Sequence, residues 1–281
     1  MNFEDRFEAP VPAGEGAFGK VYRLKEKKTG VNYALKVMEN RSVWEKECRF
    51  LQLADHPLFP KPEESGEEDG KYYILMEYLY GTPLDVVLDD RRGFGQTDAV
   101  RLALQIADGL AWLQEKDGTV LFRDLKAENL ILQPDGNVRL TDLGSACFLS
   151  EAGRSRAGTP GASAPEQFSA PETAGAYSDV YAFGLLLHYL LTGENPLGGE
   201  PESLRSVDPS CSACLELLIE DCLRPAGEER IPDMLGVLQR LMDIVTASPG
   251  AYRRMEKAAS KELAGRYGLE GDILYTKNVK L

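Results

Sequence analysis

The dominant spacing of apolar residues changes near residue 84, and this change constrains the fold more than any other feature. Before it, apolar and polar residues alternate around glycine-rich turns, with the period of two that is typical of strands. After it, apolar residues recur at helical spacing, first on a face that runs from Val100 to Leu113. The sequence therefore predicts an α+β protein, with a small β-rich part followed by a larger helical part.

The same patterns assign individual elements. The elements expected in the first part are strands at 18–24, 31–37 and 72–78 and a helix at 43–53. Short strands are expected at the start of the helical part, at 120–122, 130–133 and 138–140. The acidic stretch 63–70 predicts a solvated hairpin tip. After residue 248 we expect a short helix and then a tail, for which the sequence indicates no function.

Composition and charge narrow the possible partners and location. The chain has 281 residues, enough for two lobes, and a formal net charge of −13, which argues against general nucleic-acid or anionic-membrane binding. The longest apolar stretch, Val180 to Leu191, is shorter than the ~20 residues that cross a bilayer, so we expect a buried helix and no membrane insertion. The five cysteines and an N-terminus without an export pattern favour a reducing, cytoplasmic location, whereas nothing indicates the oligomeric state.

A glycine-rich segment near the N-terminus predicts phosphate binding. Gly14, Gly16 and Gly19 precede Val21 in the pattern G-x-G-x-x-G-x-V, in which missing side chains let backbone N–H groups approach phosphate oxygens. Alone, such glycines are as often a simple hairpin. The next expected strand ends in Tyr33-Ala34-Leu35-Lys36, and a lysine in this place can bind the α- and β-phosphates of a nucleotide.

Further motifs follow in a fixed order. They are Arg123-Asp124-Leu125-Lys126-Ala127-Glu128-Asn129, Asp142-Leu143-Gly144, Gly158-Thr159-Pro160 and Ala164-Pro165-Glu166. With the two N-terminal motifs they match the order of the phosphoryl-transfer signatures. Over roughly residues 10–240 the chain therefore resembles the eukaryotic-like serine/threonine protein kinases.

The resemblance implies a bilobal kinase-like fold that uses ATP and Mg²⁺ to phosphorylate serine or threonine residues of protein substrates, with autophosphorylation expected. The implied divisions are an ATP-binding N-lobe at 1–79, a C-lobe at 80–247, and a C-terminal helix and tail at 248–281. The implied roles are Asp124 as the carboxylate that orients the attacking hydroxyl, Lys126 at the transferring phosphate with Thr159 beside it, and Asn129 and Asp142 as oxygen ligands of the metal.

The partner of Lys36 is expected to be Glu47, with Glu45 as the rival. Glu47 has the family's spacing before His56 and the better helical frame, because Leu51, one turn later, then points inward. The resemblance also implies an adenine pocket with a gatekeeper methionine and a hinge strand. Its expected members are Val21, Ala34, Met76, Glu77, Leu79 and Ile131.

Three acidic or hydroxyl positions complete the expectation. Asp179 is expected to tie down the catalytic loop, and Glu166 to form an ion pair with Arg230. Ser155, four residues before Thr159, is expected to be a regulatory phosphosite that pairs with Arg123. The alternative for Ser155 is a loop serine without a role.

Two residues depart from the family pattern. Phe122 stands where a histidine is usual, and Leu143 stands where a phenylalanine is usual. We interpret both as tolerated apolar replacements. The alternative is that they indicate lost turnover, in which case the protein would be a pseudokinase that acts as a nucleotide-binding scaffold. A small-molecule phosphotransferase is a third candidate, but such enzymes lack the segment from Gly158 to Glu166.

Overall fold

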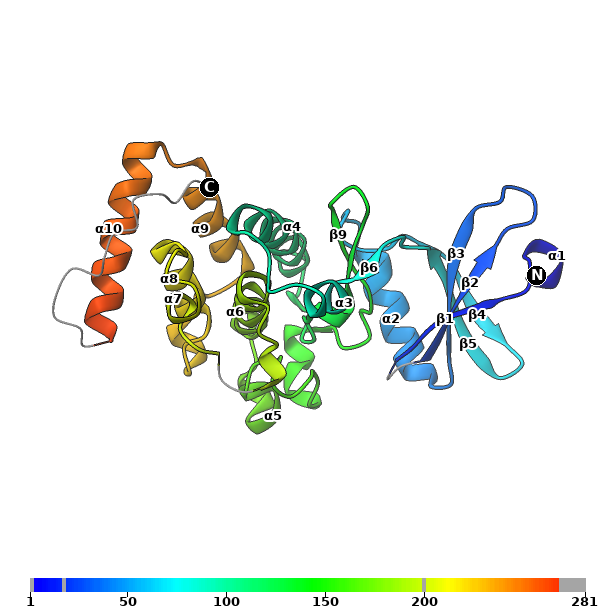
Figure 1. Ribbon diagram of the computed structural model, residues 1–281. Helices are drawn as coiled ribbons and strands as arrows, with labels where there is room; N and C mark the ends of the chain where they lie inside the picture. The colour runs from blue at the N-terminus through cyan, green and yellow to red at the C-terminus, as the bar shows by residue number, and fades with distance from the viewer. Residues whose placement is uncertain (1–2, 17–18, 199–200, 268–281) are drawn as a thin grey trace. The chain divides into compact units, whose positions relative to one another are not determined.

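The computed structural model describes residues 3–16, 19–198 and 201–267, and the chain divides into two compact units. The first unit comprises residues 1–83 and 129–146, and the second comprises 84–128 and 147–281. Strands dominate the first unit and helices the second (Figure 1). The predicted α+β class is therefore confirmed.

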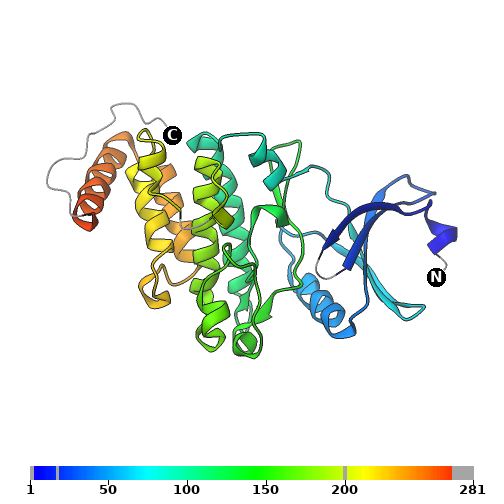
Figure 2. The ribbon, with the colours of Figure 1, turned by 60° about the horizontal axis from the view of Figure 1, so that its bottom comes forward.

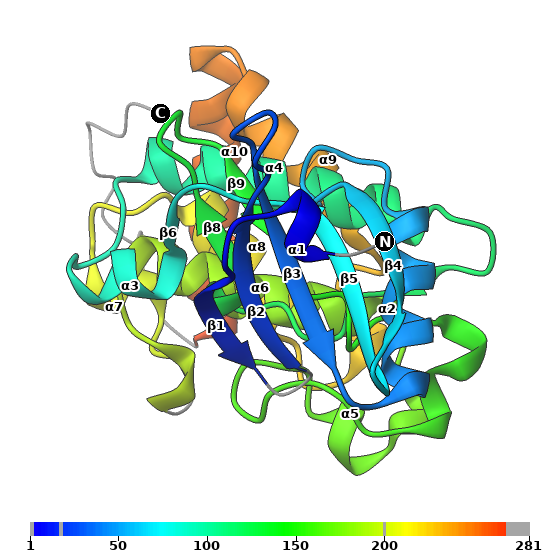
Figure 3. The same ribbon diagram turned by 90° about the vertical axis from the view of Figure 1, so that its right-hand side faces the viewer.

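A five-stranded antiparallel sheet forms the body of the first unit, in the order β1-β2-β3-β5-β4 (Figure 3). Its strands are β1 (Val11–Gly16), β2 (Gly19–Lys25), β3 (Asn32–Met38), β4 (Pro62–Glu68) and β5 (Lys71–Glu77). The three strands expected from alternation are confirmed to within one residue at each end. Phe18, the first residue of one of those expectations, lies outside the described residues.

The acidic stretch 63–70 was predicted wrongly as a hairpin tip. Most of it is β4, which pairs along its length with β5, and only Asp69 and Gly70 turn the chain, both with positive φ. β4 is an edge strand, so its backbone pairs on one side, and most of its side chains are exposed to water. An edge strand of this kind shows no apolar alternation, and the same holds for β1, which is exposed throughout.

Alternation along β3 gives the sheet two different faces. Lys36 and Met38 are buried on the face that meets α2 (Arg41–Leu53). Tyr33 and Leu35 point to the opposite face, where the N-terminal helix α1 (Phe3–Arg6) and the following Phe7 pack on them. Burial on both faces explains why β3 has a fixed register, since a slip of one residue would exchange the faces.

A separate hairpin completes the first unit. β8 (Leu130–Leu132) and β9 (Val138–Leu140) pair with each other, and β8 also pairs with β6 (Thr82–Pro83). This pairing explains why 129–146 groups with the N-terminal residues although it follows a long helical segment. The expected division at residue 80 assigned this hairpin to the C-lobe, whereas the structure groups it with the N-terminal unit. The functional roles expected for 1–79, 80–247 and 248–281 stay predictions.

The second unit is a helical bundle around α6 (Figure 1). Its longer helices are α4 (Gln96–Gln114), α6 (Ala176–Thr192), α8 (Ala213–Cys222), α9 (Met234–Thr246) and α10 (Pro249–Arg266), and its shorter ones are α3 (Leu84–Asp89), α5 (Glu166–Ser169) and α7 (Leu204–Val207). β7 (Val120–Leu121) pairs with β10 (Cys147–Phe148). Within α6, the stretch from Val180 to Leu191 is buried, as expected, except for the half-buried Tyr181. Within the described ranges, no helix is both long and apolar enough to span a membrane.

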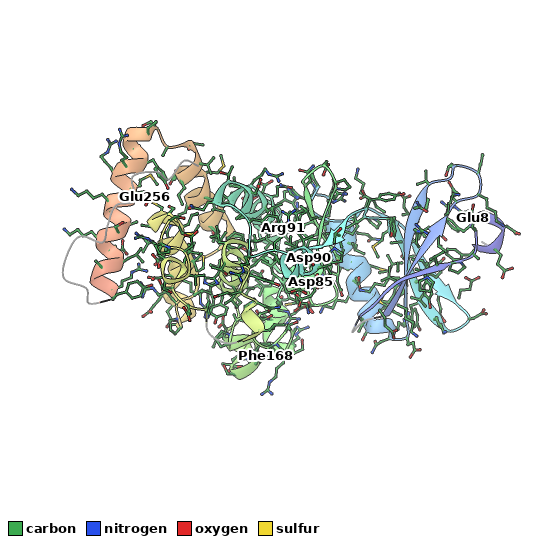
Figure 4. The ribbon with its side chains drawn as sticks, viewed as in Figure 1. Glu8, Asp85, Asp90, Arg91, Phe168 and Glu256 are labelled. Atoms are coloured by element: carbon green, nitrogen blue, oxygen red, sulfur yellow. The ribbon has the colours of Figure 1, made fainter. Side chains whose placement is uncertain are left out.

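The expected C-terminal helix is α10, and it is fastened to α8 at two points (Figure 2). At the start of α8, the Glu256 carboxylate accepts bonds from the Ser212 hydroxyl and from the N–H groups of Ala213 and Cys214, both at 3.1 Å (Figure 4). At the end of α8, Arg266 lies 2.7 Å from Asp221. Glu256 thus satisfies N–H groups that the first turn of α8 leaves without intrahelical partners.

We expect Glu256→Gln to lower the free energy of unfolding by about 1–2 kcal/mol at neutral pH, because the charge at the helix N-terminus is lost. Burial acts to raise the pKa of Glu256, but the bonds from Ser212, Cys214 and Ala213 outweigh it and hold the pKa below its ordinary value of 4.5. A pKa that is lower in the folded state adds stability above pH 4.5, and this stability disappears as the folded carboxylate takes up its proton at lower pH.

Urea unfolding of the two proteins between pH 7 and pH 3 measures this difference. The matched control is Glu262→Gln, which removes a more exposed carboxylate from the same helix. Equal destabilisation by both substitutions, or a difference that grows as the pH falls, would contradict the capping role of Glu256.

Candidate active site

A buried lysine lies at the centre of the candidate site in the first unit. The Nζ atom of Lys36 lies 2.7 Å and 2.8 Å from the two carboxylate oxygens of Glu47, and 3.1 Å from Oδ1 of Asp142. Lys36 is 5% exposed and Glu47 is 1% exposed. The expected ion pair with Glu47 is present, and the rival Glu45 instead pairs with Arg41 on the exposed surface of α2.

The two carboxylates keep Lys36 charged. Burial acts to lower the pKa of Lys36, but the charges of Glu47 and Asp142 and their hydrogen bonds outweigh it, so the pKa lies above its ordinary value. The site therefore holds a charged Lys36 ammonium group that is hydrogen-bonded to the carboxylates of Glu47 and Asp142. Such a charge is suited to binding phosphate oxygens.

Three residues expected in the adenine pocket share a sheet face with Lys36. Val21 lies directly opposite Lys36, and Ala34 lies opposite Met76, so the period of two places all four side chains on one face. Ala34 is buried and the other two are half-buried. Glu77, Leu79 and Ile131 are also half-buried, Glu77 at the end of β5 with Leu79 just after it and Ile131 on β8, and their role in adenine binding stays a prediction.

Of the three glycines on β1 and β2, only Gly19 is required by packing within the protein. A Cβ at Gly19 would lie 2.3 Å from the carbonyl oxygen of Val37, so close strand packing demands glycine there. Among the residues that the structure describes, no atom outside the adjacent residues lies within 4 Å of a Cβ built at Gly14 or Gly16. Packing within the protein thus does not explain these two glycines, whereas a ligand approaching the backbone would. This arrangement fits a nucleotide phosphate.

The two expected metal ligands flank the β8–β9 hairpin. Asn129 precedes β8, and its carbonyl accepts the N–H of Thr141, at 2.8 Å, just beyond β9. Asp142 follows with a φ of 59°, a left-handed conformation that is uncommon for aspartate and is supported by a 2.9 Å bond from the Gly144 N–H to its carboxylate. One amide and one carboxylate oxygen suit Mg²⁺, which usually binds one or two protein groups together with substrate phosphates.

The second unit brings together the three other residues expected to act in catalysis. The Thr159 hydroxyl donates to Oδ1 of Asp124 at 2.7 Å, and it accepts from Nζ of Lys126 at 2.6 Å. Lys126 Nζ also lies 3.5 Å from the second carboxylate oxygen of Asp124. A carboxylate, an ammonium group and a hydroxyl therefore form one closed hydrogen-bonded group, in which the carboxylate already holds an aliphatic hydroxyl.

A buried carboxylate fixes the backbone that leads to Asp124. Asp179 is 1% exposed and accepts the N–H groups of Phe122 and Arg123 at 2.9 Å and 2.7 Å, as expected. Arg123 has a φ of 70°, so these bonds hold a strained conformation one residue before Asp124. Gln114 donates to the same carboxylate at 3.1 Å. The sequence did not indicate Gln114, because a glutamine on a helix has no distinguishing pattern.

The segment between Gly158 and Glu166 is held by a second unpredicted glutamine. The Gln167 side chain donates to the carbonyls of Arg123 and Ala157, both at 2.8 Å. A Cβ at Gly158 would lie 2.8 Å from the Gln167 nitrogen and from the Arg123 carbonyl, so glycine is required where this segment passes the loop. The expected ion pair of Glu166 with Arg230 is present at 2.7 Å and 3.1 Å.

Ser155, the expected phosphosite, is exposed at the end of a 3₁₀ turn. Its backbone carbonyl accepts from Nη1 of Arg123 at 3.2 Å. The guanidinium of Arg123, which is 2% exposed, is therefore directed toward the residue that would carry the phosphate. Phosphorylation itself stays a prediction.

Comparison with known proteins identifies the family. A family model for the protein kinase domain matches residues 7–240. Serine/threonine-protein kinase AtPK1/AtPK6 of Arabidopsis thaliana is 33% identical over 205 residues, which are 69% of this chain and 43% of that protein. CBL-interacting protein kinase 8 of Oryza sativa subsp. japonica is 30% identical over 203 residues, which are 68% of this chain and 45% of that protein.

A human protein, putative serine/threonine-protein kinase PRKY, is 32% identical over 205 residues, 68% of this chain and 73% of that protein. The chain matches less than half the length of the two plant proteins. The chain belongs to the protein kinase family, and the predicted membership of its eukaryotic-like serine/threonine branch is confirmed.

We expect Lys36→Met to lower the free energy of unfolding by about 3–5 kcal/mol, because it leaves the Glu47 carboxylate buried without its cation. Adding Glu47→Gln should restore a large part of this loss, because the neutral amide removes the unpaired charge. Denaturant unfolding of the single and double variants measures both effects.

The exposed pair of Arg41 and Glu45 provides the control, since its 2.8 Å separation is nearly the same. Arg41→Met should leave the free energy of unfolding nearly unchanged, because exposed ion pairs are screened by water. A similar cost for the two cations would show that burial is not what makes the Lys36 pair important.

Proposed function

We propose that this protein is an active kinase that transfers the γ-phosphate of ATP, in a Mg²⁺-dependent reaction, to serine and threonine hydroxyls of proteins. The observation that carries the proposal is the bond between the Thr159 hydroxyl and the Asp124 carboxylate, with Lys126 on the same hydroxyl. It supports the ability of Asp124 to accept a hydrogen bond from an aliphatic alcohol, as it must from a substrate serine.

Each residue then has a definite task. Asp124 orients the substrate hydroxyl and accepts its proton, and Lys126 offsets negative charge on the transferring group. Lys36, held by Glu47, binds phosphate oxygens, while Gly14 and Gly16 allow a close approach of the backbone to the nucleotide. Asn129 and Asp142 would hold Mg²⁺, which neutralises phosphate charge when bound.

Incubation of the full chain with Mg²⁺, labelled ATP and a generic basic protein, followed by phosphoamino-acid analysis, tests the proposal. We expect label on serine or threonine, and none when Mg²⁺ is removed by a chelator. Label on tyrosine alone, or none with any acceptor, would contradict it.

We expect Asp142→Asn to reduce phosphoryl transfer by at least about 1000-fold, or 4 kcal/mol of transition-state stabilisation, because it removes the charged metal ligand. The matched control is Asp135→Asn, which changes an aspartate in the turn of the same hairpin, where the side chain bonds to Asn137. The control should retain nearly full activity. Comparable turnover of the two variants would remove Asp142 from the proposed mechanism.

The pseudokinase alternative rests on Phe122 and Leu143, which are 0% and 1% exposed. Both are fully buried apolar side chains and so serve as packing residues in place of the usual histidine and phenylalanine. The intact group around Asp124 favours turnover over a scaffold. The alternative would be supported if the protein bound nucleotide with Mg²⁺ and transferred no phosphate.

We also propose autophosphorylation at Ser155, which is exposed and lies beside the guanidinium of Arg123. A phosphate there can form a charge-assisted bond to Arg123 and order the segment that contains Thr159. We expect Ser155→Ala to lower activity after ATP treatment by about tenfold, which corresponds to one such bond of 1.4 kcal/mol. Peptide mapping and rate measurements test this.

Ser150→Ala, at another exposed serine of the same segment, is the control and should leave the rate unchanged. Full activity of Ser155→Ala, or phosphate found only at other positions, would exclude Ser155 as the regulatory site. A cytoplasmic location and action on protein substrates remain part of the proposal.

A further inference from the structure

We propose that Arg139 is a positioning residue for the metal-binding hairpin, which it ties to the sheet that carries Lys36. Arg139 lies on β9, three residues before Asp142. The inference rests on the proposed function, because it assigns Arg139 a role only through the metal ligands Asn129 and Asp142.

The contacts of Arg139 form a fork. Its Nη1 atom lies 3.0 Å from Oε1 of Glu77, and its Nη2 atom lies 2.7 Å from Oε2 of the same carboxylate. Nη2 also donates to the carbonyl of Phe59 at 2.8 Å. A planar guanidinium in a two-point contact fixes distance and orientation together, which a single-point ammonium cannot do.

Glu77 is a firm anchor for this fork. It ends β5 directly opposite Tyr33 on β3, and its N–H donates to the carbonyl of Lys61 at 2.9 Å. Its carboxylate accepts the Lys61 N–H at 3.2 Å. The bond from Arg139 is the main cause that holds the pKa of Glu77 below its ordinary value, so the pair is charged at neutral pH.

Other contacts also attach the hairpin to the rest of the first unit. β8 pairs with β6 at Thr82 and Pro83, and the N–H of Leu140 donates to the carbonyl of Leu58 at 2.7 Å. A further attachment is the ion pair of Lys36 with Asp142. In the proposed reaction this last contact competes with phosphate for Lys36, so the Arg139 fork is the ionic contact that persists.

The fork lies at the edge of a hollow in the first unit. The pair of Glu77 and Arg139 borders a hollow of about 330 Å³, whose lining also includes His56 and Lys61. Arg139 itself is largely covered, with 13% of its side chain exposed, so Arg139→Met keeps most of the packing and removes chiefly the two-point ionic contact.

The test measures binding of a fluorescent ATP analogue to the full chain, with Mg²⁺ and with a chelator. Arg139→Met should weaken binding with Mg²⁺ by about tenfold, the range seen when a residue that orients a metal ligand is removed. Binding without Mg²⁺ should change by less than about twofold, since Lys36 and the glycines are untouched and Glu77, an expected adenine-pocket residue, keeps its bonds to the Lys61 backbone. Lys61→Met is the control, because it removes a cation from the same hollow without touching the hairpin.

Two further variants keep the test decisive. Arg139→Lys retains the charge but not the fork, and it should show an intermediate loss. The exchanged pair Arg139→Glu with Glu77→Arg should bind Mg²⁺-nucleotide better than either single variant. Equal losses with and without Mg²⁺, or equal effects of Arg139→Met and Lys61→Met, would overturn the proposal.

A readout without nucleotide separates this inference from the proposed function. Hydrogen exchange at the Leu140 amide should be faster in Arg139→Met than in Lys61→Met, because the fork restrains β9. If the wild-type protein shows no Mg²⁺-dependent binding, the proposed function fails, and exchange alone then decides whether Arg139 positions the hairpin. Unchanged exchange would refute that role.

Discussion

The first unit depends on one buried positive charge. Lys36 on β3 meets Glu47 from the next element, α2, and Asp142, which lies 106 residues further along the chain in the hairpin 129–146. An ammonium group buried without partners costs several kcal/mol, and so does a buried carboxylate. The register of β3 and the placement of α2 are therefore both constrained by the need to keep these charges together.

The second unit uses a buried charge in a comparable way. Asp179 in α6 accepts the N–H groups that precede Asp124 and so holds Arg123 in a left-handed conformation, as Gly144 supports Asp142 in the first unit. In both units a strained residue lies at or next to a residue of the candidate site, where strain is maintained by surrounding bonds. Lys36 and Asp179 thus play similar structural parts, because each is a buried ionisable side chain that bonds to groups from other segments of its unit.

The sequence predicted those site residues that stand at fixed positions within recognisable motifs. Lys36, Asp124 and Asp142 stand in motifs, and the family's spacing before His56 together with the helical frame favoured Glu47 over Glu45. It could not predict β4, because an edge strand with charged side chains lacks alternation. Nor could it predict the bonds of Gln114 and Gln167, or the fork of Arg139 with Glu77, because those partners are distant in sequence and have no local signature.

The central claim is that Lys36 binds the phosphates of ATP, and affinity labelling tests it most directly. An ATP analogue with a lysine-reactive group at its terminal phosphate is incubated with the chain, and the modified peptides are identified by mass spectrometry. We predict modification of Lys36, prevented by excess ATP with Mg²⁺, and little modification of Lys20 or Lys25, which are exposed on β2. Labelling of these surface lysines without protection of Lys36 by ATP would contradict the account.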